Sequence, residues 1–398
     1  MQCVGSILKA EGTKTDSSMI ALAHHWLVSV RGGEKVLAEF HALFPNAPIS
    51  TLVCRRGEIT DLLAGSPIMT SPLQKFPGAT SFYKALLPAH AWAFNRLTVP
   101  EDTKFVLSCD AAMVKGLRLP AKAKQLCYCL SPPRYLWDMQ EVYAQNTRNL
   151  GMVGRAVFRW TVPRARRFDY AASQRVDRFI GISTFVAERI KRFYGRESDV
   201  IFPPVDVAAF DFTRDAEDFY LLVGQLAPYK RVDLAVAAFN RLKLPLVVIG
   251  EGSEMASLRK LAGPTVRLMG WQPFKVIKDH FERCRAFLYP QLEDFGITAL
   301  EAQAAGRPVI AYRAGGALDT VVEGRTGAFF DEQTPESLIG VIRRFEDEPN
   351  RYPPQICRAN AERFRPERFR SEIKAFLCKH YPELFADYEW PSCAGDVR

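Results

Sequence analysis

The second half of the chain alternates between two kinds of segment, and this alternation restricts the fold more than any other feature. One kind is a short run of branched apolar residues, and the other has the periodicity of an amphipathic helix. The strand-like runs are 219–226, 244–252, 266–271, 286–290 and 307–312. The helical segments are 231–242, 254–262, 274–284, 297–306 and 317–324. Continuously apolar strands that alternate with helices are typical of a parallel sheet covered on both faces, so we predict a doubly wound α/β domain.

The first half repeats this theme less regularly. Its strand-like stretches are 18–27, 47–53, 104–109, 124–130, 177–183 and 198–202, and residues 32–44 form a helical pattern. A chain of 398 residues is too long for one hydrophobic core. We therefore predict two Rossmann-like doubly wound domains that face each other across a cleft, joined near the paired prolines of "FPPVD" (202–206).

The predicted boundaries divide the chain into four parts. These are a flexible tail over 1–18, a first domain over 19–205, a second domain over 206–370 and a helical segment over 371–398 that crosses back to the first domain. No apolar run approaches the ~18 residues that span a bilayer, and the N-terminus lacks the apolar core of a secretory signal. Nine cysteines without a CxxC pair argue against zinc and disulfides and favour a reducing cytoplasm.

Positive charge is concentrated in the first half. Residues 1–205 carry 27 Lys and Arg against 16 Asp and Glu, whereas residues 206–398 carry 26 against 28. The density is greatest over residues 148–178, which hold eight arginines and two aspartates. This segment is either a solvated helix face or a surface for an anionic partner, such as a lipid headgroup or a phosphate-bearing acceptor. No nucleic-acid motif accompanies the charge, so we expect no nucleic-acid partner.

Charged and glycine residues follow the strands of the second half, where open α/β sheets bind their ligands. Lys230 and Arg231 come after the first strand, and two cations there suit a diphosphate that must be held and stabilised as a leaving group. Gly250 follows the next strand and lets backbone approach a ligand, although glycines are common after strands. Taken alone, such cations are more often exposed loop residues.

The stretch "EDFGITALE" (293–301) is the most informative. Gly296 precedes a helix, so the backbone N–H groups of Ile297 and Thr298 are free for an anion and the helix dipole favours one. Glu301 lies about one turn into that helix, and Glu293 lies on the loop before it. Carboxylates accept hydrogen bonds from paired hydroxyls, so Glu293 could hold a sugar and Glu301 a ribose. In isolation two such glutamates are more often solvated surface acids, but Lys230 and Arg231 near the same sheet edge favour a ligand site.

These segments, together with "VGQLAPYKRVDLAVAAF", "IGEGSE" and "GRPVIAYRAGGALDTVVEGRTGAFF", resemble glycosyltransferase family 4 of the GT-B fold. The stretches "HHWLVSVRGGEKVLAEF", "SPPRYLWD" and "RFYGRESDVIFPPVD" look closest to the mannosyltransferases of bacterial O-antigen and exopolysaccharide assembly. The resemblance implies retaining, metal-independent hexosyl transfer from a nucleotide sugar, here GDP-mannose, with no cofactor. The first domain would bind the acceptor and the second the donor.

The resemblance also assigns roles to individual residues. Lys230 would bind the diphosphate, Glu301 the ribose, and Glu293 with the Phe295–Gly296 backbone the donor sugar. Gly32 and Gly33 would form the first-domain loop near the phosphates. The implied acceptor is lipid-linked or a polysaccharide, and Arg134, Tyr135 and Trp137 of "SPPRYLWD" are candidates for contacting it. We expect a cytoplasmic protein, peripheral on the inner face of the plasma membrane.

Two positions depart from the family pattern. Gln225 replaces an arginine beside the glycine of "VGQL", and Arg231 is the candidate to compensate. Leu130 stands where a histidine that contacts the donor sugar is expected, and leucine can neither hydrogen-bond nor transfer a proton. His24 and His25 either reach the cleft instead or are structural.

Leu130 raises an alternative function, an inactive or slow nucleotide-sugar-binding paralogue that acts as a scaffold. A pyridoxal-phosphate-dependent phosphorylase of the same fold has no supporting lysine context.

Overall fold

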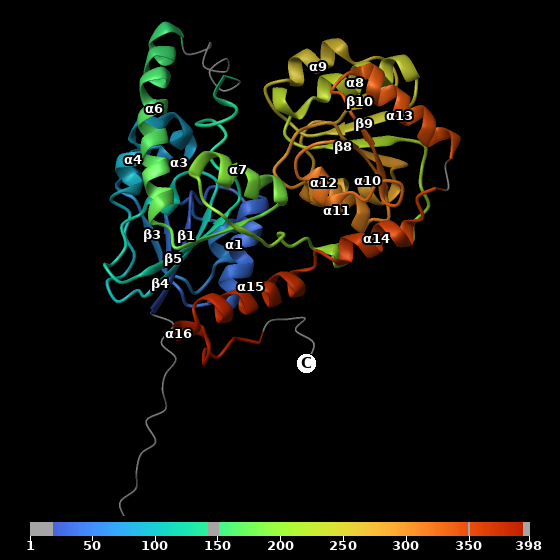
Figure 1. Cartoon of the computed structure of the whole chain (residues 1–398). Helices are drawn as coiled ribbons and strands as arrows, with labels where there is room; N and C mark the ends of the chain where they lie inside the picture. Colours follow the sequence, from blue (N-terminus) through green and yellow to red (C-terminus); the bar gives the residue numbers. More distant parts are fainter. Residues whose placement is uncertain (1–18, 142–150, 349–350, 393–398) are drawn as a thin grey trace, which may run out of the picture.

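The computed structural model describes residues 19–141, 151–348 and 351–392, and the predicted tail over 1–18 lies outside these ranges. Figure 1 shows two α/β domains side by side, with the C-terminal helices running beneath both of them. The two domains each contain one parallel sheet with helices on both faces. The predicted pair of doubly wound domains in a GT-B arrangement is therefore confirmed.

The first domain is built on a seven-stranded sheet in the order β3-β2-β1-β4-β5-β6-β7. Its strands are β1 (Ile20–His24), β2 (Ile49–Thr51), β3 (Ile68–Thr70), β4 (Phe105–Asp110), β5 (Lys124–Cys129), β6 (Arg178–Gly181) and β7 (Asp199–Val200). Its helices are α1 (Gly32–Leu43), α2 (Glu58–Leu62), α3 (Ala79–Phe82), α4 (Leu87–Phe94), α6 (Gly151–Arg175) and α7 (Thr184–Tyr194). The central strand β1 pairs in register with β4 from Ile20–Phe105 to His24–Cys109, and its five residues are buried because helices cover both faces.

The second domain has a six-stranded parallel sheet in the order β10-β9-β8-β11-β12-β13. Its strands are β8 (Tyr220–Val223), β9 (Leu246–Ile249), β10 (Val266–Leu268), β11 (Ala286–Tyr289), β12 (Val309–Tyr312) and β13 (Gly327–Phe330). Its helices are α8 (Val232–Leu242), α9 (Met255–Leu261), α10 (Phe274–Arg283), α11 (Ile297–Ala304), α12 (Ala317–Thr320) and α13 (Pro335–Asp347). The strand order reverses between β8 and β11, so the loops that follow these two strands border a topological switch point.

The alternating pattern predicted most strands, and the two that it missed are short. β3 is a three-residue edge strand whose side chains are partly exposed, so it has no continuous apolar run. β13 begins at Gly327, whose Cα faces the Val309 carbonyl so closely that an added Cβ would lie 2.0 Å from that oxygen. Glycine weakens the strand pattern in the sequence, but here it permits the close approach of two strands.

The chain returns to the first domain through its last helices. After α14 (Pro354–Glu362), helix α15 (Pro366–His380) begins with proline at its first position and is followed by α16 (Pro382–Phe385). Arg370 of α15 donates a 2.6 Å hydrogen bond to Glu39 of α1, and Phe369 packs on Phe40 with ring centroids 5.4 Å apart. The crossing therefore begins at Pro366, five residues before the boundary drawn from the sequence.

Within residues 19–141, 151–348 and 351–392, none of the helices combines the length and the apolar character that a membrane span requires. The seven cysteines within those ranges are free thiols, and five of them are buried. Cys109 and Cys127 are among the buried ones, and a buried free cysteine packs as a small apolar residue.

Candidate functional site

The loops after β8 and β11 bring Lys230 and Glu293 into contact. Lys230 ends a short 3₁₀ turn, Pro228–Lys230, and Glu293 lies between β11 and α11. The ammonium of Lys230 forms an ion pair with Glu293 Oε1, and the two side chains are only 18% and 20% exposed. Neighbouring parallel strands end at the same edge of a sheet, which is why residues 63 positions apart in the sequence meet here.

Two glycines hold the Glu293 loop in place from behind. The backbone N–H of Gly316 donates a 2.9 Å hydrogen bond to the Glu293 carbonyl, and a Cβ added to Gly316 would lie 2.2 Å from Phe295 Cα. Gly296 has φ of 111°, a conformation that favours glycine. Phe295 is buried and stacks on Phe202 with ring centroids 5.8 Å apart. Of Phe295, only the backbone is therefore available to a ligand.

The N-termini of α11 and α1 meet across the two domains. Gly32 begins α1 and lies against Ile297, so an added Cβ would be 2.7 Å from Ile297 Cδ1. The first backbone N–H groups of a helix, including those of Ile297 and Thr298 in α11, have no intrahelical acceptor. Two helix N-termini at one place favour an anion, and the anion site predicted for α11 stays a prediction.

Glu301 also faces the first domain. Its Oε1 lies 3.8 Å from Nζ of Lys35 in α1, and its side chain is 13% exposed. Burial raises the pKa of Glu301, and the positive charge of Lys35 opposes that rise. The sequence contained no signal for Lys35, because a lysine on the first turn of a helix is ordinary.

A buried network joins the two domains directly beside Glu293. Asp294 accepts a 2.9 Å hydrogen bond from Arg134 Nε and another of 2.9 Å from an Arg189 Nη atom, and both arginines belong to the first domain. Arg189 also donates to Asp138 and Ser131. Thr184 of the first domain forms a further link at an exposed position, where its amide and its hydroxyl both donate to Asp319. Sequence reasoning missed this network, although Asp294 is adjacent to a predicted site residue.

Three other predicted donor residues have different surroundings. The guanidinium of Arg231 lies 3.4 Å from Asp233 and 3.3 Å from the Gln333 carbonyl, and it does not contact Glu293. Gln225 is exposed after β8. Gly250 has φ of 147°, and an added Cβ would lie 1.8 Å from the Gly224 carbonyl oxygen. The close approach at Gly250 is thus to the chain's own backbone.

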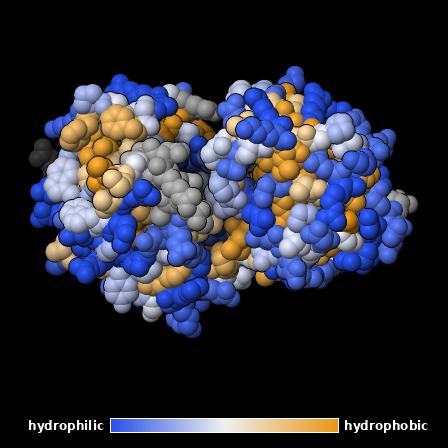
Figure 2. All heavy atoms as spheres, turned by 90° about the horizontal axis from the view of Figure 1, so that it is seen from above, coloured by the Kyte–Doolittle hydropathy of each residue, from blue (hydrophilic) through white to orange (hydrophobic). Residues whose placement is uncertain are grey.

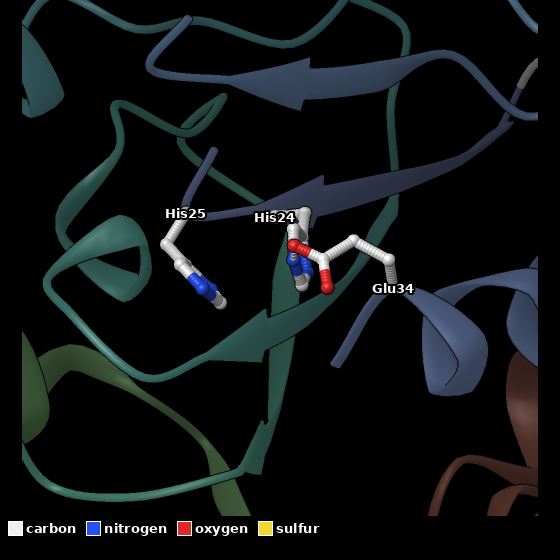
Figure 3. A group of neighbouring side chains, drawn as sticks. All are labelled: His24, His25 and Glu34. Atoms are coloured by element: carbon white, nitrogen blue, oxygen red, sulfur yellow. Dashed lines mark ion pairs between the residues drawn. The ribbon is translucent and has the colours of Figure 1, made fainter. Parts of the chain in front are cut away.

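Gly32 and Gly33 form the first residues of α1 and not a loop, and His24, His25 and Glu34 form a buried cluster next to this helix start. Figure 3 shows the carboxylate of Glu34, from the first turn of α1, beside the His24 ring, and His24 Nε2 lies 3.6 Å from Glu34 Oε1. Burial and the neighbouring His24 lower the pKa of His25 to about 3. Both histidines are almost inaccessible, at 0% and 6% exposed, so neither reaches the cleft. Leu130 packs in front of them, 2.8 Å from a Cβ added to Gly33.

In the described part of the chain, this cluster is the one group with the spacing of metal ligands, its candidate atoms all lying within 4.8 Å of one another. Two of its side chains already have protein partners. Glu34 accepts a 2.9 Å hydrogen bond from the Arg31 amide and so caps α1, and His25 Nδ1 lies 3.5 Å from the Cys109 carbonyl. A structural role accounts for this geometry.

The three residues predicted to contact the acceptor do not all lie at the same place. Tyr135 lines a cavity of about 620 Å³ beside Glu293 and Asp294. Arg134 borders the same cavity while it is engaged with Asp294. Trp137 instead donates a 2.8 Å hydrogen bond to the buried Asp169 and stacks on Phe193 at 5.1 Å. Its indole is held in the first domain and does not line the cavity that Arg134 and Tyr135 border.

Residues 209–364 match the family described as glycosyl transferases group 1. An uncharacterized glycosyltransferase of Methanocaldococcus jannaschii is 24% identical over 180 residues, 44% of this chain and 51% of its own length. A GDP-mannose-dependent alpha-mannosyltransferase of Mycolicibacterium smegmatis is 30% identical over 190 residues, 46% of this chain and 49% of its own. The chain thus spans about half the length of the curated relatives it matches.

A solved structure supports the fold over a longer part of the chain. The HepE protein of Anabaena, solved in complex with UDP and glucose, superposes with a TM-score of 0.64 at 16% identity. The superposition covers 90% of this chain and 99% of HepE. At this identity the likeness concerns the fold, and it includes both domains.

Proposed function

We propose that this chain, whose residues 209–364 match the group 1 glycosyl transferases, transfers a hexosyl group from a nucleotide sugar to a lipid-linked or polysaccharide acceptor. The observation that carries the proposal is the contact of Lys230 with Glu293 beside the meeting N-termini of α1 and α11. A nucleotide sugar joins a diphosphate directly to a sugar, so it presents an anion and hydroxyls at adjacent positions. In this site Lys230 and the N-termini of α1 and α11, which suit the anion, lie next to Glu293, which suits the hydroxyls.

The residues of this chain would divide the chemistry as follows. Lys230 and the amides at the two helix termini bind the diphosphate and stabilise the charge that develops as the nucleoside diphosphate departs. Glu293 accepts hydrogen bonds from the sugar, and Glu301 accepts from the ribose. Arg231 is adjacent to Lys230 in sequence and adds positive charge at longer range. This arrangement fits metal-independent transfer with retention, which the family 4 resemblance implies.

GDP-mannose is the proposed donor, supported by the resemblance to mannosyltransferases and by the name of one relative. A nucleotide screen by thermal denaturation tests this choice. A ligand present at about 100 times its Kd stabilises the folded state by about 2.7 kcal/mol. We expect GDP and GDP-mannose to raise the Tm more than UDP or UDP-glucose do.

Tripolyphosphate is the control in that screen, because a chain of net charge +9 attracts any polyanion. A rise with tripolyphosphate equal to that with GDP, or no rise with any nucleotide, would remove the nucleotide site. A larger rise with UDP would keep the site and change the donor.

Leu130 favours a second candidate, a nucleotide-sugar-binding scaffold without turnover. An apolar side chain packed against Gly33 offers no proton transfer on the first-domain side of the site. Slow hydrolysis of the bound donor in the absence of acceptor separates the two candidates. A transferase releases nucleoside diphosphate under these conditions, whereas a scaffold binds the donor and leaves it intact.

We further propose that the first domain lies against an anionic cytoplasmic membrane surface through α6. Arg159, Arg164 and Arg167 are exposed on this helix, whereas Arg166 turns inward and donates to the Leu136 carbonyl at 2.8 Å. Arg166 is therefore not one of the arginines that we propose to face the lipid surface. A basic side chain near anionic lipid adds about 1 kcal/mol of salt-sensitive attraction.

We expect the protein to sediment with vesicles that contain phosphatidylglycerol, and to lose most of this binding when Arg159, Arg164 and Arg167 are changed to glutamine. Changing Arg259, Arg267 and Arg325, which are exposed on the second domain, is the matched control with the same loss of charge. Equal binding to neutral and anionic vesicles, or an equal loss in the control, would reduce the arginines of α6 to a solvated face.

A further inference from the structure

The 620 Å³ cavity beside Glu293 differs in character at its two ends. One end is polar, because Glu293, Asp294 and Arg134 border it. Apart from Tyr229, the other lining residues lie in the first domain, and most of their side chains are apolar. Those used in the argument are Trp26, Leu87, Pro88, Val157 and Phe158.

Two packed helices form the apolar walls. Leu87 and Pro88 begin α4, while Val157 and Phe158 lie on α6. Buried residues of both helices belong to the same hydrophobic cluster, including Phe94 of α4 and Val162 of α6. The walls are therefore parts of the folded domain, and the volume is within the ~300–1,000 Å³ typical of ligand sites.

One lysine, Lys84, lies among the apolar residues of the lining, and its side chain is exposed. Lys84 lines the cavity, and in the described residues no carboxylate pairs with its ammonium. Partial burial and the positive charge of Arg31 both lower the pKa of Lys84. A mainly apolar cavity lined by one lysine without a carboxylate partner, Lys84, is complementary to a ligand that combines a hydrocarbon chain with an anionic group.

The outer surface near this cavity is also apolar. Large side chains are exposed along α6 and α4, namely Met152 (80%), Val153 (76%), Val157 (43%), Trp160 (56%) and Trp92 (43%). Figure 2, seen from above, shows hydrophobic atoms gathered on the first domain, at the end where α6 projects in Figure 1. Val157 belongs to both the surface and the cavity lining, so the two are continuous at this residue.

We propose that the cavity binds the hydrocarbon chain of a lipid phosphate acceptor. The chain lies between α4 and α6, and the phosphate group contacts Lys84. The proposal rests on the proposed transferase function and selects the lipid-linked acceptor over the polysaccharide. A polysaccharide presents hydroxyls along its whole length, and apolar walls would leave them without hydrogen-bond partners. The sugar that the lipid phosphate carries then places its reacting hydroxyl at the polar end, beside Glu293.

Calorimetry with dodecyl phosphate below its critical micelle concentration tests the chain and the phosphate separately. Ethyl phosphate carries the same anion without the chain, and maltoheptaose is a glycan without either. We expect wild-type protein to bind dodecyl phosphate at one site and to bind the other two at least tenfold more weakly. Equal affinity for ethyl phosphate, or stronger binding of maltoheptaose, would overturn the lipid assignment.

Two variants locate the binding. Val157→Asp places a negative charge in the apolar wall and Lys84→Gln removes the cation, and each should weaken dodecyl phosphate about fivefold. Val153→Asp is the matched control, since Val153 is exposed on the same helix one turn earlier and does not line the cavity. If Val153→Asp weakens binding as much as Val157→Asp, the probe binds the helix surface and the cavity proposal is wrong.

GDP binding, measured on the same samples, separates this proposal from the proposed function. Unchanged GDP affinity in both variants, with weakened dodecyl phosphate, is the expected result and also shows that the variants fold. Wild-type protein that binds GDP but not dodecyl phosphate would overturn only the cavity proposal. Binding of dodecyl phosphate by protein that binds neither GDP nor UDP would overturn the transferase and with it the acceptor role of the cavity.

Discussion

Lys230→Ala should slow hexosyl transfer at least tenfold and weaken nucleoside diphosphate binding, while the protein stays folded. The substitution removes a charge-assisted contact to the diphosphate, worth about 1.5–3 kcal/mol. More is lost in the transition state, where negative charge on the leaving group increases. It also leaves the carboxylate of Glu293 without its present partner. Steady-state transfer rates and calorimetry with GDP measure the two effects.

Lys260→Ala is the control for that prediction. Lys260 lies on α9 of the same domain and is exposed, so its loss changes the net charge equally without touching the site. Lys260→Ala should leave both measurements unchanged. Unaltered donor affinity and rate in Lys230→Ala would remove the phosphate assignment of Lys230.

Glu301→Ala and Glu293→Ala should separate nucleotide binding from sugar transfer. Glu301 has the ribose as its proposed partner, so its loss should weaken GDP by about 1.5–3 kcal/mol, the range of hydrogen bonds to a charged group. Glu293 has the donor sugar as its partner, which GDP lacks. Glu293→Ala should therefore leave GDP affinity nearly unchanged and reduce transfer by more than tenfold. Calorimetry beside a transfer assay measures both.

Glu301→Gln is the informative companion to these two variants, because an amide oxygen still accepts one hydrogen bond. It should weaken GDP less than Glu301→Ala does. If both alanine variants weaken GDP equally, or if neither does, the proposed division between ribose and sugar is wrong. Loss of the Lys35 contact alone has little effect, since an ion pair with a half-exposed lysine contributes about 1 kcal/mol or less.

The sequence determined the second domain almost completely. Apolar strand runs and helical periods are local patterns, so β8 to β12 and the helices between them could be read from neighbouring residues. The meeting of Lys230 with Glu293 also followed, because parallel strands next to a topological switch point end at the same edge. Local periodicity and one topological rule were sufficient there.

Contacts between the domains were decided by the tertiary structure alone. Arg134 and Asp294 are 160 positions apart, and no periodic pattern connects an arginine on one domain with an aspartate on the other. The tertiary structure also decided that Lys35 lies near Glu301. Within the first domain, it decided the inward turn of Trp137 and the burial of His24 near Leu130. The cavity between α4 and α6 is a further case, since its walls come from segments about 70 residues apart. Such features depend on how whole elements pack against one another, whereas a sequence pattern reports only the face that each element buries.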